Sequence, residues 1–132
     1  MSDPVREYLQ DKGCGEHVIS RGLLGLVENW EQVVESVSDG YNLGLDDYLN
    51  DMDVRQLLAE AILIASHSEK QRAQSRIVEA DEQIKSHLHP AEECLWGDEV
   101  AAEEGWTRQQ NWWYFNYPEN AGEDLRDELG RD

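Results

Sequence analysis

Two stretches of apolar residues at helical spacing constrain the fold of this chain more than any other feature. The first lies in residues 16–38 and the second in residues 45–65, and in both the apolar positions recur every three or four residues. The pair Asp39-Gly40 between them is a typical helix stop, because glycine readily adopts the left-handed conformation that ends many helices. Two amphipathic helices joined by so short a loop are expected to pack antiparallel, which predicts an all-α fold.

The apolar pattern of the second stretch shifts its phase near Met52. Apolar positions before and after this point lie on different faces of a continuous helix. We therefore predict two helices with a joint at Met52–Asp53, in which Asp53 is the N-cap of the second helix and Gln56 completes a capping box. The run from Ala61 to Ala65 contains no polar residue, so this part should be covered on nearly all sides.

Two glycines interrupt the first stretch. Gly22 and Gly25 each cost about 1 kcal/mol relative to alanine inside a helix, so they need a structural reason. We expect that another helix packs closely against these glycines. The alternative is that the helix breaks near Gly22.

A third helical signal lies in residues 68–88. Its apolar residues form a narrow stripe in a mostly charged sequence, which is typical of an amphipathic helix on the surface of a bundle. Pro90 should end this helix near His89. Whether residues 54–88 form one helix or two stays open, because the residues between the stripes are weak helix breakers.

The C-terminal third differs in character from the rest of the chain. The aromatic run from Trp112 to Tyr117 is expected to be helical or irregular, because a strand there would have no visible partner. The tail is either a short amphipathic helix or disordered.

We predict an all-α, single-domain bundle of about five helices with an aromatic-rich, partly irregular C-terminal segment. The bundle domain spans residues 1–118, and the acidic tail spans residues 119–132.

The charge balance is strongly acidic. The sequence contains 29 Asp and Glu against 11 Lys and Arg, a net charge of −18, and residues 91–132 hold 12 acidic and 3 basic side chains, which is half of the excess. Such a surface repels nucleic acid and anionic membranes and attracts basic partners, although acidity also serves solubility. No apolar run approaches the roughly 20 residues of a membrane helix. No secretory leader is visible, so we expect a cytoplasmic protein with two free cysteines.

The aromatic residues near the C-terminus are the best functional candidate. Tryptophan and tyrosine dominate the energetics of binding surfaces, and an acidic rim around them suits a basic, partly apolar protein. The alternative is that the rings complete the core. We expect a non-enzymatic interaction module of the inhibitor, immunity or adaptor type, without a cofactor, as a monomer or as a structural homodimer joined through this segment. The predicted partner-binding residues are Trp106, Trp112, Trp113, Tyr114 and Tyr117.

A cluster of carboxylates indicates an alternative function, a metal-dependent hydrolase. Hard cations bind carboxylate oxygens, which Asp46, Asp47, Asp51 and Glu60 would supply. The spacing departs from the DDxxD pattern of aspartate-rich magnesium sites, because Asn50 stands where the last acid belongs. Asp46 and Asp47 are also explained by the favourable field at the start of a helix. The structural role is the simpler interpretation, and an enzyme is the less favoured function.

Overall fold

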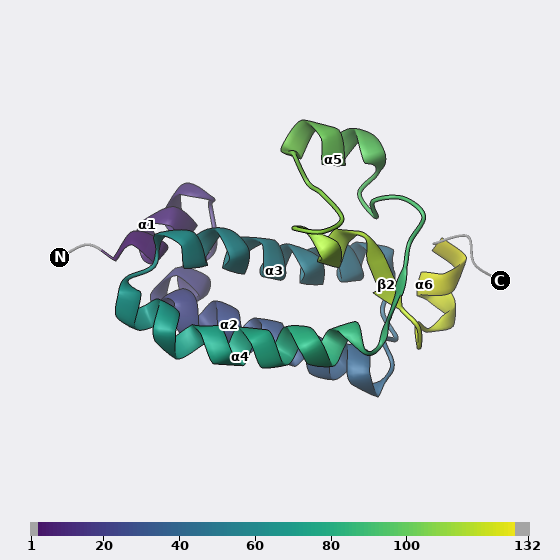
Figure 1. The fold of residues 1–132 in the computed structure, drawn as a ribbon, viewed down its shortest axis with the longest axis horizontal. Helices are drawn as coiled ribbons and strands as arrows, with labels where there is room; N and C mark the ends of the chain where they lie inside the picture. Colours follow the sequence, from purple (N-terminus) through teal and green to yellow (C-terminus); the bar gives the residue numbers. More distant parts are fainter. Residues whose placement is uncertain (1–2, 129–132) are drawn as a thin grey trace.

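The computed structural model describes residues 3–128 and confirms the predicted all-α bundle (Figure 1). Its α-helices are α1 (Pro4–Asp11), α2 (Glu16–Asp39), α3 (Leu45–Ile64), α4 (His67–Lys85), α5 (Asp98–Glu104) and α6 (Glu123–Glu128). A short 3-10 helix, η1 (Trp112–Tyr114), and two short strands, β1 (Leu88–Pro90) and β2 (Asn116–Pro118), lie in the C-terminal third. Within the described part of the chain, no helix combines the length and the apolar character needed to cross a membrane.

Gly22 marks a kink in α2. Its φ of 60° and ψ of −146° lie outside the helical region, in a conformation that is essentially restricted to glycine. The break near Gly22 is therefore the correct explanation for this residue. Gly25 accommodates a close approach, but by the preceding turn rather than by another helix, because a Cβ at Gly25 would lie 2.4 Å from the Cβ of Arg21.

α3 is one continuous helix, so the predicted joint at Met52–Asp53 is wrong. The phase shift arises because different elements cover its two halves. Near its start, the ring of Tyr48 packs edge-on against Tyr41, which follows α2, with 5.2 Å between the ring centroids. Near its end, Glu60 accepts a hydrogen bond of 2.7 Å from the hydroxyl of Tyr8 in α1. A helix that is buried on two different faces needs no break to explain two apolar stripes.

Asp53 lies inside α3 and does not cap it. Its carboxylate accepts a hydrogen bond from the hydroxyl of Tyr114 and another, of 3.3 Å, from the indole N–H of Trp96. Gln56 likewise bonds to Asn111 at 3.0 Å and to Glu60 at 2.9 Å instead of forming a capping box. These polar side chains of α3 therefore anchor the C-terminal third of the chain.

α3 and α4 are two helices joined by a tight turn at Ala65 and Ser66. Both residues have extended backbone, with ψ of 155° and 157°, and the hydroxyl of Ser66 accepts a hydrogen bond from the N–H of Glu69 at 3.3 Å. Residues 54–88 thus contain two helices. The turn makes them antiparallel (Figure 1).

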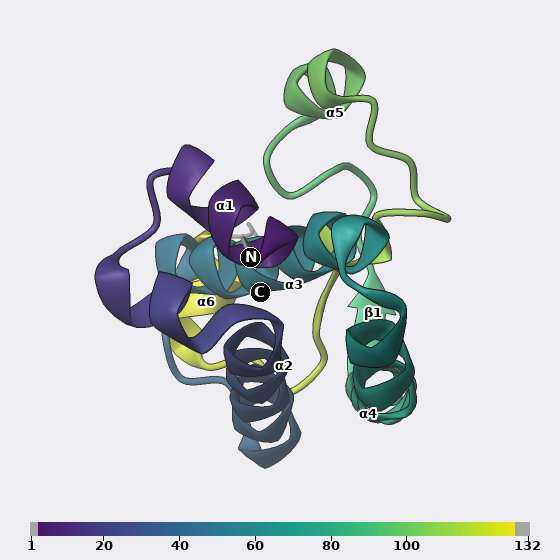
Figure 2. The same cartoon turned by 90° about the vertical axis from the view of Figure 1, so that its left-hand side faces the viewer.

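α2 is the centre of the bundle. It packs against α1, α3 and α4, whereas α3 and α4 make few direct contacts with each other. Figure 2, which looks along the bundle, shows the three long helices in a triangular arrangement. The expectation that Ala61 to Ala65 is covered on nearly all sides is wrong, because Leu63 is 75% exposed and Ile64 is 43% exposed.

The aromatic run is helical over Trp112–Tyr114, as expected, but its end forms an unexpected strand, β2. β1 and β2 pair antiparallel, with Leu88 opposite Pro118, His89 opposite Tyr117 and Pro90 opposite Asn116. The partner strand was hidden in the sequence because the helical stripe of residues 68–88 extends past the true end of α4 at Lys85. The pairing brings the chain back across the end of the bundle, with α5 protruding from it (Figure 1).

The described part of the acidic tail packs on the bundle through α6. Leu125 is fully buried in the core, and a carboxylate oxygen of Glu128 accepts a hydrogen bond of 3.0 Å from the backbone N–H of Leu45 at the start of α3. The N–H of Gly122 donates to the carbonyl of Tyr41 at 2.6 Å. Residues 129–132 of the predicted tail lie outside the described residues.

Candidate functional site

The aromatic residues predicted to bind a partner divide into buried and half-buried side chains. Trp113 is 2% exposed and Tyr114 is 1% exposed, so both belong to the core. Trp106 stacks on Tyr114 with 4.1 Å between the ring centroids. The half-buried members, which reach the surface, are Trp106, Trp112 and Tyr117.

A short turn positions the aromatic segment, which we define as residues 106–117. The hydroxyl of Thr107 accepts a hydrogen bond of 3.1 Å from the N–H of Gln110, and Asn111 accepts one of 3.1 Å from the N–H of Thr107. The segment is tied to α3 through Tyr114, whose hydroxyl donates to Asp53. Burial, together with this hydrogen bond, raises the pKa of Tyr114, so its hydroxyl remains a donor at neutral pH.

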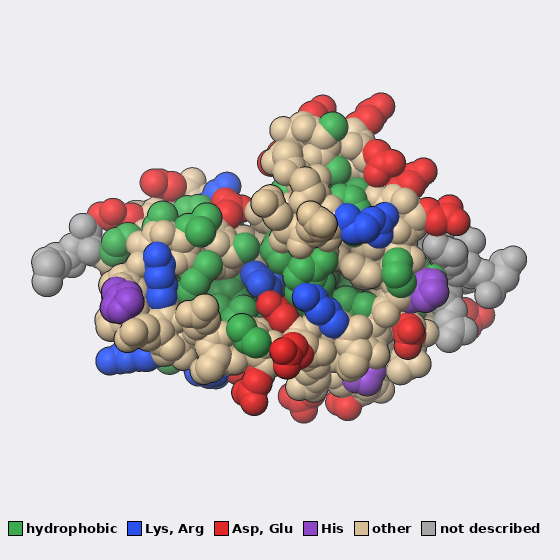
Figure 3. All heavy atoms as spheres, viewed as in Figure 1, with side chains coloured by type: hydrophobic (Ala, Val, Ile, Leu, Met, Phe, Trp, Pro, Cys, Tyr) green, Lys and Arg blue, Asp and Glu red, His purple; other side chains and the backbone are tan. Residues whose placement is uncertain are grey.

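A groove of about 580 Å³ runs between α3 and α4 and ends at the aromatic segment. We call it the α3–α4 groove. Figure 3 shows apolar side chains gathered over the middle of this face, with basic and acidic side chains beside them. The apolar lining comes from Ile62 and Leu63 of α3, Ile77 and Val78 of α4, and Trp112.

Two cationic side chains lie over the tryptophans of the groove. The guanidinium of Arg55 is 4.5 Å from the ring centroid of Trp113, and the ammonium of Lys85 is 4.6 Å from that of Trp112. With Lys70, the lining holds three basic side chains against the single carboxylate of Asp81. These tryptophans therefore have basic neighbours, which do not suit a basic partner.

Acidic side chains gather instead in a second cleft, of about 260 Å³. Glu92 and Glu93, from the segment after β1, and Glu128 of α6 line it together with Tyr117 and Leu95. We call it the acidic cleft. The three carboxylates are exposed, and Tyr117 and Leu95 are half-buried.

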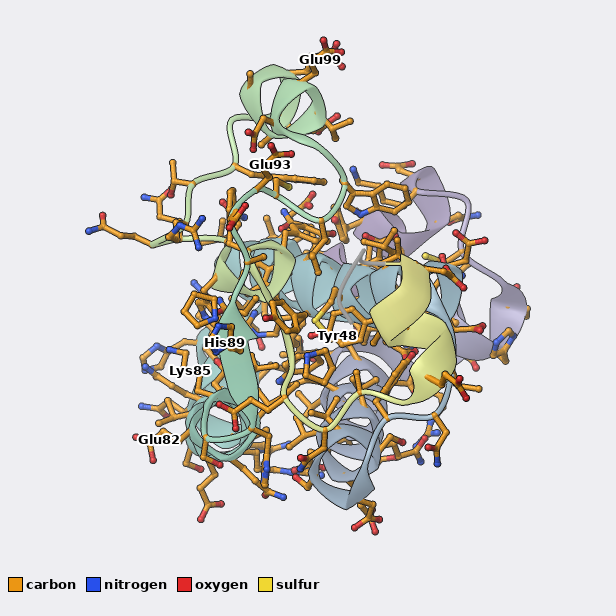
Figure 4. All side chains as sticks on the ribbon, turned by 90° about the vertical axis from the view of Figure 1, so that its right-hand side faces the viewer. Tyr48, Glu82, Lys85, His89, Glu93 and Glu99 are labelled. Carbon is orange, nitrogen blue, oxygen red and sulfur yellow. The ribbon has the colours of Figure 1, made fainter. Side chains whose placement is uncertain are left out.

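The labelled acids in Figure 4 show how the negative charge is distributed. Glu93 lies on the segment between β1 and α5, Glu99 lies on the protruding α5, and Glu82 lies on the outer face of α4. The negative charge therefore extends well beyond the acidic cleft. What distinguishes the cleft is the combination of carboxylates with an aromatic ring and aliphatic side chains.

The predicted site residues consequently separate onto different parts of the molecule. Trp112 and Trp113 line the α3–α4 groove, and Tyr117 lines the acidic cleft. Trp106 and Tyr114 line neither surface and stack on each other above α3.

The carboxylates of the metal hypothesis do not converge. Asp46 and Asp47 are exposed in the first turn of α3, Asp51 accepts a hydrogen bond of 2.6 Å from the hydroxyl of Tyr41, and Glu60 lies more than two turns further along the helix. Within residues 3–128, no group of three or more His, Cys, Asp or Glu side chains is arranged to hold a metal ion. Asp51 and Glu60 act as hydrogen-bond acceptors that join α3 to its neighbours.

Apart from Trp112 and Trp113, the residues that line the α3–α4 groove are not indicated by the sequence as a binding surface. The apolar run around Leu63 predicts an interior position for this residue, and Val78 lies beside the apolar stripe of α4 rather than in it. The one usable signal is the adjacent pair Ile77-Val78, which broadens the apolar face of an otherwise charged helix. Arg55 and Asp81 gave no signal, because their roles depend on the distance between two helices.

No family model, no curated protein and no solved structure matches this chain. Its function is therefore inferred from the two surfaces themselves, one apolar with basic side chains and the other acidic with an aromatic side chain.

Proposed function

We propose that this protein is a non-enzymatic interaction module, of the inhibitor, immunity or adaptor type, which binds a basic segment of a partner protein in the acidic cleft. The observation that carries the proposal is the convergence of Glu92, Glu93 and Glu128 around Tyr117 and Leu95. A lysine or arginine side chain has an apolar stem and a charged head. The stem matches the tyrosine and leucine of the cleft, and the head matches its carboxylates.

The wider charge distribution supports a basic partner. Residues 91–132 carry half of the net charge of −18, and an acidic field of this kind accelerates the approach of a basic protein. Arg108 lies beside the cleft, but its guanidinium donates to the backbone carbonyls of Glu92 and Phe115, at 3.3 and 3.1 Å, and not to a carboxylate of the cleft. The carboxylates of Glu92 and Glu93 are exposed and available to an incoming cation, and Glu128, one oxygen of which accepts the N–H of Leu45, offers its other oxygen.

A cytoplasmic location belongs to the same proposal. Cys14 and Cys94 are both free thiols, as is usual in a reducing compartment. Burial raises the pKa of the Cys94 thiol, which favours its protonated, less reactive form.

The test compares two triple variants that change the net charge equally. The first neutralises the acidic cleft by Glu92→Gln, Glu93→Gln and Glu128→Gln. The matched control neutralises three exposed acids of α5 by Glu99→Gln, Glu103→Gln and Glu104→Gln. The wild-type protein and both variants are immobilised, exposed to an extract of the native host, and the retained proteins are identified by mass spectrometry at low and high salt.

We expect a basic protein to be retained by the wild type and by the α5 variant, to be lost from the cleft variant, and to elute as salt rises. Equal retention by the two triple variants would show that only the overall charge matters. Retention of an acidic protein, unaffected by either set of changes, would also contradict the proposal.

A further inference from the structure

We infer that the α3–α4 groove is a docking site for an amphipathic helix of a partner protein, with its apolar face in the groove and acidic side chains along its edges. This surface lies apart from the acidic cleft and has basic side chains where the cleft has acidic ones. The inference therefore does not rest on the proposed function, and it concerns a partner segment of different chemistry.

Two apolar side chains of the groove are exposed in a way that folding alone does not explain. Leu63 is 75% exposed and Val78 is 48% exposed, although both lie on long helices of the bundle. Ile62, which is half-buried, and Ile77, which is buried, continue the apolar lining beside them. Isolated exposed leucines are ordinary, but apolar side chains from two helices that line one groove are typical of an interaction site.

The shape of the groove fits a helix. Its walls are one face of α3 and one face of α4, which run antiparallel and make few direct contacts, while α2 packs behind both. The α4 wall extends from Lys70 to Lys85, about 22 Å at 1.5 Å per residue, and the α3 wall extends from Arg55 to Leu63, about 12 Å. A helix of about four turns would therefore follow α4 along its length and α3 over about two turns. A helix placed there would contact both walls, as the missing member of a four-helix bundle would.

The charges of the groove select an acidic helix. Asp81 is already paired with Arg55, which leaves Lys70 near one end of the groove and Lys85 near the other without an opposing carboxylate in the lining. Gln74, Gln109 and Gln110 add amide groups that donate and accept hydrogen bonds. Acidic side chains flanking an apolar helical stripe would pair with both lysines.

The charge balance also argues against a second copy of this chain as the occupant. Two copies would each bring a net charge of −18, and their association would be opposed by repulsion. A partner helix that concentrates its acids beside the two lysines avoids most of this cost, because the rest of the partner is free to be neutral or basic.

The experiment uses two synthetic helical peptides of about 15 residues, enough for four turns. Both carry leucines at helical spacing, and the flanking positions are glutamate in one peptide and lysine in the other. Binding to the full-length protein is measured by calorimetry and by amide NMR shifts. We expect the glutamate peptide to bind at least about tenfold more tightly, to weaken as salt rises, and to shift the resonances of residues 62–63 and 77–78.

Two variants locate the site. Leu63→Glu places a charge in the groove at an exposed position and should weaken binding of the glutamate peptide by at least about tenfold. Leu43→Glu makes the same change at an exposed leucine in the loop before α3 and should leave binding unchanged. Thermal unfolding of both variants checks that the fold is retained.

Several outcomes overturn the inference. Equal affinity for the two peptides, binding of neither, or binding that Leu63→Glu leaves unchanged would each show that the groove does not select an acidic helix. Sedimentation that finds a homodimer, dissociated by Leu63→Glu, would replace the partner helix by a second copy of the chain.

Discussion

Arg55 and Asp81 join α3 to α4 through two hydrogen bonds, from Nε to Oδ1 at 3.0 Å and from a terminal nitrogen to Oδ2 at 2.9 Å. The same Oδ1 accepts the indole N–H of Trp30 in α2 at 2.9 Å. Arg55 also lies over the ring of Trp113. One carboxylate therefore connects the three long helices, and its cationic partner extends the connection to the aromatic segment.

Neutralising Asp81 should destabilise the protein substantially. Asp81→Asn leaves an acceptor for Trp30 but leaves Arg55 without its counter-charge. We expect the free energy of unfolding to fall by about 2–3 kcal/mol, somewhat less than for a fully buried pair, because the side chains of Arg55 and Asp81 are 11% and 15% exposed. Urea denaturation followed by circular dichroism measures the loss.

The ion pair between Arg76 of α4 and Glu31 of α2 provides the control. Its side chains are 39% and 37% exposed, so Glu31→Gln should cost no more than about 1 kcal/mol. In addition, Arg55→Met should lower the free energy of unfolding less in the Asp81→Asn protein than in the wild type, because the two residues stabilise the fold as a pair. Similar losses for Asp81→Asn and Glu31→Gln would show that burial does not strengthen the first pair.

The kink in α2 should depend on glycine at position 22. Gly22→Ala forces a side chain into the conformation φ 60°, ψ −146°, and we expect a loss of about 1–3 kcal/mol in the free energy of unfolding. The nearest atom to an added Cβ, Arg6 Nε, is 3.6 Å away, so the cost comes from the backbone rather than from a clash. Gly105, in the ordinary left-handed conformation with φ 74° and ψ 25°, gives the comparison. Thermal unfolding should show a larger loss for Gly22→Ala than for Gly105→Ala, and the reverse order would refute this account of the kink.

Local chemistry explains which parts of this fold follow from the sequence. The helix stop at Gly40, the amphipathic stripe of α4 and the overall all-α class depend on residues a few positions apart, and they are predicted. Asp53 shows where such reasoning fails. By local rules it is a good N-cap, yet its carboxylate bonds to Tyr114, 61 positions away, and the helix runs through it.

The candidate site was harder to predict than the fold for the same reason. The α3–α4 groove exists because α2 holds the two helices apart, and no spacing within α3 or α4 encodes that distance. The sequence indicated aromatic residues that do line the two surfaces, but it did not indicate that Trp112 lies beside Lys85 while Tyr117 lies beside acidic residues.

Tyr48 should tolerate the loss of its hydroxyl. The group is buried and makes no hydrogen bond with any described residue, and an unsatisfied buried hydroxyl costs about 1–3 kcal/mol. Tyr48→Phe keeps the ring contact with Tyr41 and should raise the free energy of unfolding by about 1 kcal/mol. Tyr41→Phe removes a hydroxyl that donates to Asp51 and should lower the free energy of unfolding by about 1–2 kcal/mol. If chemical denaturation finds a loss of stability for Tyr48→Phe, the hydroxyl has a favourable contact after all.

Asp51 and Glu60 should give opposite contributions to the pH dependence of stability. Burial, assisted by the nearby charge of Asp47, raises the pKa of Asp51 despite the hydrogen bond from Tyr41. The folded state then holds this proton more tightly than the unfolded state, so the contribution of Asp51 to stability falls as pH rises through its folded pKa. For Glu60, burial alone would raise the pKa, but the hydrogen bonds from Tyr8 and Gln56 and the charge of Lys12 together lower it. Its contribution is present above the ordinary carboxyl pKa and is lost as pH falls through the lowered value.

The two isosteric variants separate these contributions. The free energy of unfolding of Asp51→Asn, relative to that of the wild type, should be higher at pH 7 than at pH about 3, because the change removes a charge that the folded state disfavours. Glu60→Gln should be less stable than the wild type at pH 7, and the difference should shrink at pH about 3, where the carboxyl of the wild type becomes protonated. Both pH values lie away from the sequence isoelectric point of about 4.3, where an acidic protein is least soluble. Urea denaturation of the three proteins at the two pH values measures the differences. The same sign of pH dependence for both variants would mean that burial and hydrogen bonding do not act on these carboxylates as the geometry requires.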